Sequence, residues 1–212
     1  MSNLIFLLNV VLHAWFLLKL LGSIQSDPKT PLSKRPVLNN EDWKTLIKRI
    51  NEISKMMMDR GMPLAYHHHM GTVIETQSDT ERLMDNTVDE VKLLIDTGHM
   101  LFAGGNSIKL LEDYYQKLIH VHTKDIRKKI LERSLKNDYT FREAFLAGAF
   151  TVPGDGCIDY KPFIKKLKEK NYSGWIVVEA EQDPAKANPL KYAKIGYKYL
   201  SKVIREVGYE IV

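Results

Sequence analysis

The stretch "VKLLIDTGH", residues 91–99, decides the fold class, because an apolar run ends there abruptly in polar residues. Residues 91–96 are long enough and apolar enough for a strand that is buried on both faces. The stretch "SIKLLEDYYQKL", 107–118, then predicts a helix, and "IHVHTKD", 119–125, predicts a second strand. A strand, a crossover helix and another strand are typical of a parallel sheet with right-handed connections.

The same alternation of helix and strand extends over the chain from residue 40 onward. Ser78 and Glu81 stand at the spacing of a capping box, which predicts the start of a helix. The other expected elements are helices in 41–61 (with Asn40 as cap), 140–150, 160–174 and 188–208, strands in 62–69 and 175–181, and a loop in 26–40. Four strands make half of an eight-stranded barrel. We therefore predict an α/β fold of the (β/α)8 TIM-barrel type, partial, with the strands of the last half of the barrel.

The composition fits one globular domain, which we place at residues 23–212. The chain has 212 residues, of which 44% are hydrophobic, and a formal charge of +5. Its basic residues are interleaved with acids, as on solvated helix faces, so we expect no nucleic-acid partner. Cys157 is the only cysteine, which excludes a disulfide framework and a thiolate metal site and favours a reducing, cytoplasmic setting.

The first 22 residues form a separate, atypical apolar segment. Residues 3–24 are nearly continuous apolar sequence, long enough to cross a bilayer. No basic residue precedes this run, as one would in a secretory signal, and His13 and Lys19 would be costly at bilayer depth. Membrane contact through residues 1–22 is therefore an alternative that we do not favour. A buried hydrophobic helix and an atypical start on a truncated chain are the other interpretations.

Polar residues capable of chemistry gather where the four predicted strands end. Six of the seven histidines lie at the ends of three consecutive predicted strands, and ligands bind at this end of parallel α/β sheets. Side-chain alternation and the cost of burying an unpaired carboxylate single out one residue from each strand. The predicted metal ligands are His67, Asp96, His122 and Glu179. Imidazole and carboxylate without thiolate suit Mn, Co, Fe or Zn.

Further polar residues surround these four. His99, three residues after Asp96, is expected to contact substrate or to support a ligand, as are Lys124 and Glu181. The turn "FTVPGDG", 150–156, holds Asp155 between two glycines near the same rim. Glu75 is a rival ligand for the first strand, but we interpret it as an exposed loop acid close to a helix N-terminus.

Five motifs resemble those of the inosose dehydratases, the 2-keto-myo-inositol dehydratases of inositol catabolism. They are "YHHHMGT" (66–72), "DTGH" (96–99), "HVHTKDIR" (120–127), "FTVPGDG" (150–156) and "GWIVVEAEQDPAKANPLKYAK" (174–194). The resemblance runs from about Gly22 to the C-terminus, and these dehydratases belong to the xylose-isomerase-like barrel superfamily. It implies a barrel fold, a divalent metal (Mn or Co), glutathione dependence and a cyclic polyol ketone as the small-molecule substrate.

Two departures from the superfamily pattern matter. His67 stands where the superfamily usually has a glutamate, which argues against isomerase chemistry with two carboxylates around one carbon. The first strands of a barrel are also missing from the sequence, so we expect the chain to be truncated at its N-terminus. The open edge of such a sheet makes dimerisation, or cover by an N-terminal helix, an expectation.

The resemblance predicts a metal-dependent hydro-lyase that converts 2-keto-myo-inositol to a trihydroxycyclohexanedione. His69 or Glu181 would take the proton, and Lys124 or His99 would assist departure of the hydroxyl group. His99, Arg127 and Asp155 would contact the substrate. The alternatives are a sugar isomerase or epimerase, a phosphodiesterase of the AP-endonuclease type, and an inactive remnant that keeps the site.

Overall fold

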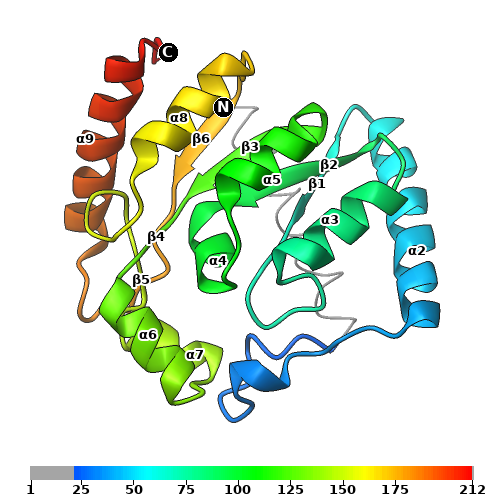
Figure 1. Ribbon diagram of the computed structural model, residues 1–212, viewed down its shortest axis with the longest axis horizontal. Coiled ribbons are helices and arrows are strands. Elements are labelled where there is room, and N and C mark those ends of the chain that lie inside the picture. The colour runs from blue at the N-terminus through cyan, green and yellow to red at the C-terminus, as the bar shows by residue number, and fades with distance from the viewer. Residues whose placement is uncertain (1–21, 212) are drawn as a thin grey trace.

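The computed structural model describes residues 22–211, and its centre is a four-stranded parallel sheet (Figure 1). The strands β1 (Leu64–His67), β2 (Val91–Asp96), β3 (Leu118–Thr123) and β6 (Trp175–Val178) are neighbours in the order β1-β2-β3-β6. Each pair is parallel, as the alternation of helix and strand predicts. The predicted α/β fold of the TIM-barrel type is confirmed.

The predictions for the N-terminal segment concern residues 1–22, of which residues 1–21 lie outside the described residues. Within residues 22–211, none of the helices combines the length and the apolarity that crossing a membrane requires.

The register of the sheet brings the predicted ligands to one face. His67 pairs with Leu94, two residues before Asp96, while Asp96 pairs with His122 directly. His122 in turn pairs with Val177, two residues before Glu179. Because side chains two residues apart on a strand point to the same face, all four ligand candidates project from one face near the strand ends.

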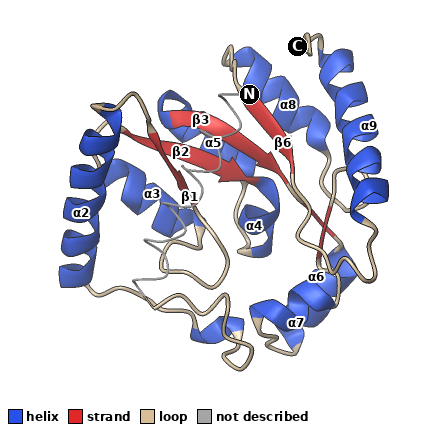
Figure 2. Ribbon diagram, turned by 180° about the vertical axis from the view of Figure 1, so that it is seen from behind, coloured by secondary structure: helices blue, strands red, loops and turns tan. Residues whose placement is uncertain are grey.

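Helices cover the other face of the sheet. The helix α5 lies over the strands in Figure 1, whereas Figure 2 shows the strands from behind. The helices are α2 (Asn40–Met58), α3 (Gln77–Asn86), α4 (Thr97–Phe102), α5 (Ser107–Tyr114), α6 (Lys128–Lys136), α7 (Phe141–Leu146), α8 (Tyr160–Glu169) and α9 (Pro189–Val207), with short 3₁₀ turns at Leu32–Lys34 and Tyr115–Lys117.

Several helix boundaries differ from the predicted ones. The capping box of α3 is formed by Thr76 and Asp79 rather than Ser78 and Glu81, because Thr76 is the residue with extended backbone before the first turn. Asn39, one residue before the expected Asn40, caps α2. The predicted helix 140–150 ends at Leu146, and the chain returns as β5 (Phe150–Thr151), which pairs antiparallel with β4 (Asp125–Ile126).

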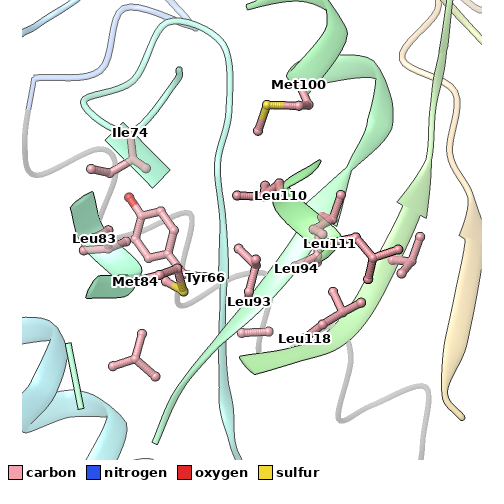
Figure 3. Packing of buried hydrophobic residues seen from close by; sticks show 14 of the residues in the cluster. Tyr66, Ile74, Leu83, Met84, Leu93, Leu94, Met100, Leu110, Leu111 and Leu118 are labelled. Carbon is pink, nitrogen blue, oxygen red and sulfur yellow. The ribbon is translucent and has the colours of Figure 1, made fainter. Parts of the chain in front are cut away.

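The main apolar core lies between the sheet and helices α2, α3, α5 and α8. Figure 3 shows Tyr66 of β1 beside Ile74, Leu83 and Met84. Leu93 and Leu94 are consecutive residues of β2, so they point to opposite faces, and both are buried. This double burial is why β2 consists of an unbroken apolar run instead of alternating apolar and polar residues.

Helix α9 closes the molecule against the edge strand β6. Gly196, in the middle of α9, faces Val178 and Val152 so closely that a Cβ atom there would lie 2.6 Å from Val178 Cγ1. Asn188 caps the helix at its start, and Gly208 ends it in the left-handed conformation.

Candidate metal centre

The four predicted ligands converge at the ends of their strands. Asp96 Oδ2 lies 3.5 Å from His67 Nε2 and 3.6 Å from His122 Nδ1, and His122 Nδ1 lies 2.8 Å from Glu179 Oε2. Donor atoms of His67, Asp96 and His122 all lie within 4.8 Å of one another. We call the four residues His67, Asp96, His122 and Glu179 the cage.

Each cage residue holds one buried polar atom without a hydrogen-bond partner. These atoms are His67 Nε2, Asp96 Oδ2, His122 Nδ1 and Glu179 Oε2. The short contact between His122 and Glu179 is too poorly aligned for a hydrogen bond, so it satisfies neither atom. An unsatisfied buried polar group costs about 1–3 kcal/mol. Two nitrogens and two oxygens that share this deficit fit a divalent cation of the Mn, Co, Fe or Zn type.

Local structure determines which oxygen of Asp96 faces the cage. Its Oδ1 accepts hydrogen bonds from Gly98 N and His99 N, both at 2.9 Å, and so caps helix α4. Only Oδ2 remains for the cage. The next histidine of the triplet, His68, points the other way, as alternation predicts, and its Nε2 accepts a hydrogen bond from Asp96 N at 3.3 Å.

A second group of side chains lies beside the cage. It consists of His69, His99 and Glu181, which we call the upper triad, and donor atoms of all three lie within 4.8 Å of one another. The rings of His69 and His99 are 3.8 Å apart between centroids. Lys124 Nζ lies 2.8 Å from His99 Nε2 and 2.9 Å from Glu181 Oε2. The same ammonium lies 3.5 Å from Asp96 Oδ2 and 3.4 Å from Glu179 Oε2, so it connects the two groups.

Burial and the carboxylates set the charge of these groups. Burial lowers the pKa of His69 to about 4 and that of His99 well below its usual value, so both rings are neutral at pH 7. Burial also lowers the pKa of His122, but Asp96 and Glu179 outweigh it and raise that pKa to about 9. For Lys124, burial is again outweighed, by Asp96, Glu179 and Glu181, so its pKa is raised and the side chain is charged.

Burial likewise opposes ionisation of the two cage carboxyls, but the cations beside them have the larger effect and lower both pKa values. Lys124 is the main cause that holds the pKa of Asp96 well below its usual value. Lys124 and His122 together lower the pKa of Glu179 to about 2. Both cage carboxyls are therefore ionised at pH 7 and can act as metal ligands.

Three residues without an obvious role in the sequence hold Lys124 in place. Thr97 Oγ1 and Tyr160 OH both donate to the carbonyl oxygen of Lys124, each at 2.8 Å. A Cβ atom at Gly98 would lie 2.7 Å from Lys124 Cγ, so only glycine leaves room for the lysine stem. Thr97 and Gly98 could have been recognised in the sequence, because both lie inside the motif "DTGH". Tyr160 could not, because it lies in an ordinary helical pattern.

Glu75 lies in the loop between β1 and α3, as expected, but the prediction that it is exposed is wrong. It is 8% exposed, because the loop bearing Arg35 lies against it. Its Oε2 accepts a hydrogen bond from Gly71 N at 2.6 Å, and burial raises its pKa to about 7. Among the described residues, Glu75 forms no hydrogen bond or ion pair with the cage.

Arg127 and Asp155, the two expected substrate contacts outside the cage region, bind each other. Arg127 Nη2 lies 2.6 Å from Asp155 Oδ2, and its Nη1 donates to Gly148 O at 2.8 Å. Together with Gln182 and Tyr192 they line a pocket of about 350 Å³. Gln182 directly follows Glu181 in the chain, so this pocket adjoins the upper triad through the loop after β6.

Comparison with known proteins supports the same fold and the same resemblance. A family model described as xylose isomerase-like TIM barrel matches residues 10–203. An inosose dehydratase of Clostridium beijerinckii is 46% identical over 182 residues, which cover 85% of this chain and 61% of that protein. The rhizopine catabolism protein MocC of Rhizobium meliloti is 41% identical over 183 residues, covering 86% and 56%. The chain thus spans about three-fifths of the length of these relatives.

Solved structures with the same fold are more distant in sequence. The IOLI protein, in a crystal structure with a binding zinc atom, matches 84% of this chain and 61% of its own, with a TM-score of 0.63 and 20% identity. The probable 3-DHS dehydratase AsbF from Bacillus anthracis matches 82% and 60%, with a TM-score of 0.62 and 16% identity. The resemblance of the chain to the inosose dehydratases is confirmed by the sequence comparison.

Proposed function

This chain belongs to the xylose isomerase-like TIM barrel family, and from that premise we propose that it carries the metal centre of a hydro-lyase. The substrate is 2-keto-myo-inositol, and the product is a trihydroxycyclohexanedione. Relatives named inosose dehydratase, 46% identical in one case, support this reaction. The observation that carries the proposal is the cage, where four strands each contribute one buried donor atom that lacks a partner.

The cofactor we propose is a divalent cation, Mn or Co, held by His67, Asp96, His122 and Glu179. When bound, such a cation polarises a carbonyl oxygen and stabilises negative charge that develops on it. The donor set supports this assignment, since imidazole nitrogens and carboxylate oxygens are suitable ligands for these metals. Glutathione, implied by the resemblance, is proposed as an additional cofactor without assigned residues.

His69 is the proposed base that removes the proton next to the ketone. Its Nδ1 lies 2.8 Å from the carbonyl oxygen of Met70, which can only accept, so Nδ1 carries the ring proton. Its Nε2 is therefore unprotonated and available to take the C–H proton. Glu181, the other candidate, has its Oε2 engaged by Lys124, so we propose that it orients the lysine.

Lys124 is the proposed acid for the leaving hydroxyl group. The electron pair of the broken C–H bond forms a carbon–carbon double bond as the C–O bond breaks, and the departing hydroxide takes a proton from the ammonium and leaves as water. His99 Nε2, which accepts from Lys124, holds the ammonium in position. Hydroxide is far more basic than any lysine, so the transfer proceeds although the pKa of Lys124 is raised.

Arg127, Asp155 and His99 are the residues we propose for binding the substrate hydroxyls. The pocket of about 350 Å³ beside the upper triad supports this role for the first two. We also propose a cytoplasmic setting, supported by the single, exposed Cys157. We further propose that the chain associates with a second copy of itself.

Metal-loaded protein incubated with 2-keto-myo-inositol tests the proposed reaction. We expect dione formation that stops after treatment with a chelator and returns with Mn or Co. Glu179→Gln, which removes a cage charge, should lose most of this activity, while Glu41→Gln on the surface should keep it. Undiminished turnover in chelated protein would refute the proposal, and solvent exchange of the substrate proton without loss of water would indicate an isomerase or epimerase instead.

A further inference from the structure

The Lys124 ammonium lies between donor atoms of His99 and Glu181, two members of the upper triad. We propose that His69, His99 and Glu181 form a second cation position, and that Lys124 occupies it and so restricts the site to a single metal ion. The inference rests on the proposed function only in taking the cage as the first cation position.

The three residues of the upper triad have the ligand types and the spacing of a metal site, if Lys124 is left out of account. Its donor atoms lie within 4.8 Å of one another, and two imidazoles with one carboxylate are a common ligand set for divalent metals. His99 is fully buried and His69 is nearly so. Lys124 Nζ is within 2.9 Å of donor atoms on two of the three residues, which is the place a metal ion would take between them.

One divalent metal ion and one lysine together balance the negative charges of this region. Asp96, Glu179 and Glu181 are the carboxylates within 3.5 Å of Lys124 Nζ. A divalent cation in the cage together with one ammonium balances these three negative charges. A second divalent cation would add positive charge that no further carboxylate offsets. The lysine therefore fills the second position and already balances the remaining negative charge, so a second metal ion is not needed there.

Lys124 is held at its backbone and at its ammonium, and its side chain is buried. Its carbonyl is held from two sides by Thr97 and Tyr160, and Gly98 lies against its stem. Lys124 is 1% exposed, so solvent offers it no alternative position. The ammonium is therefore a fixed part of the site, unlike a mobile surface lysine that could yield to a metal.

This arrangement separates the chain from two-metal enzymes that cleave phosphodiesters. Paired metal ions in such enzymes stabilise both the attacking and the leaving oxygen. Here the second position carries a cation that can also donate a proton, which suits loss of water. A phosphodiesterase of the AP-endonuclease type would need more than one metal ion.

The metal content of Lys124→Ala tests the inference. Protein is saturated with Mn or Zn, dialysed against metal-free buffer, and its metal is counted per chain by mass spectrometry. We expect one equivalent in the wild type, two in Lys124→Ala, and one again in the double variant Lys124→Ala/His69→Ala. Lys117→Ala, which removes a partly buried lysine at the far end of β3, is the matched control and should hold one.

Two results would overturn the inference: a second equivalent already in the wild type, or a single equivalent in a folded Lys124→Ala. If Lys124→Ala does not fold, Lys124→Gln keeps most of the stem without the charge and serves the same comparison, with circular dichroism as the check on folding. Failure of the proposed function is recognised separately, because it appears as absent dione formation in the wild type, whatever the metal count of the variants.

Discussion

Asp96 uses its two carboxylate oxygens for different purposes. Oδ1 caps helix α4 through Gly98 N and His99 N, and Oδ2 is the buried atom that faces the cage. The sequence predicts the second role, because an acid at the end of a buried strand needs a partner. The first role depends on α4 beginning directly at residue 97, which the sequence pattern did not indicate.

Comparison of Asp96→Asn with Asp96→Ala separates these two roles. Asparagine keeps an oxygen for the helix cap but removes the charge. Loss of a residue that only orients a ligand already lowers metal affinity by about 10–100-fold, so we expect a fall of at least about 100-fold in both variants. Alanine also removes the cap, which should lower the free energy of unfolding of metal-free protein by about 1 kcal/mol more than asparagine does. Metal titration and urea unfolding measure the two effects. Equal stability of the variants would contradict the capping role.

Glu75 makes stability depend on pH near neutrality. Its pKa rises from 4.5 to about 7 on folding, so the folded protein binds more protons than the unfolded chain within that window. The free energy of unfolding therefore falls as the pH rises from about 4.5 to 7 and is unaffected by this group above it. The full change is about 3 kcal/mol at most.

Glu75→Gln should abolish this dependence, because glutamine still accepts from Gly71 N but does not titrate. We expect the variant to gain stability relative to the wild type as the pH rises through the window, measured by urea unfolding at a series of pH values. Glu132→Gln, an exposed acid on α6, is the control. Parallel curves for Glu75→Gln and wild type would show that Glu75 does not carry the effect.

At the scale of elements, the four strands of the parallel sheet were predicted, whereas β5 and several helix ends were not. Strand β2 matches residues 91–96 because its apolar run is bounded by polar residues. Helix α7 was predicted four residues too long, since Ala147–Phe150 is apolar enough to continue it. Gly148 instead takes a φ of 83°, which turns the chain into β5. The turn leads into the pairing of β5 with β4, which are distant in sequence. A local sequence pattern does not indicate such long-range pairing.

Gly196→Ala should destabilise the protein although alanine favours helices. Alanine in place of glycine normally stabilises a helix by about 1 kcal/mol. Here the new methyl group would lie 2.6 Å from Val178 Cγ1 and 3.0 Å from Val152 Cβ, so α9 must move away from β6. We expect a net loss of about 1–3 kcal/mol in the free energy of unfolding. Lys198→Ala on the exposed side of α9 should be close to neutral, and a stabilised Gly196→Ala would contradict the close packing.

At the scale of the whole molecule, the cage could be predicted because parallel strands bring their ends to one edge. His67, Asp96, His122 and Glu179 are distant in sequence, but each lies at or just after the end of an apolar strand, and that shared position was enough to predict that they converge. The hydrogen bond from Tyr160 to the Lys124 carbonyl could not be predicted, since it joins α8 to the residue after β3, and the two residues are distant in sequence.

Metal binding should stabilise the whole domain. At a free metal concentration 100 times the dissociation constant, the free energy of unfolding should rise by about 2.7 kcal/mol. For a chain of this size that corresponds to a melting temperature higher by roughly 5–10 °C. Thermal unfolding with and without Mn or Co measures the shift, and Asp96→Asn at the same metal concentration should show much less of it. A wild type indifferent to both metals would contradict the cage.

Because the cage takes one donor from each of four adjacent strands, its geometry depends on the correct register of all four. A slip of one residue in any of them would turn its donor to the opposite face. Cobalt bound at this position would therefore have a visible absorption spectrum that reports correct assembly of the sheet. Refolding could then be followed by colour, at the moment when the last strand aligns.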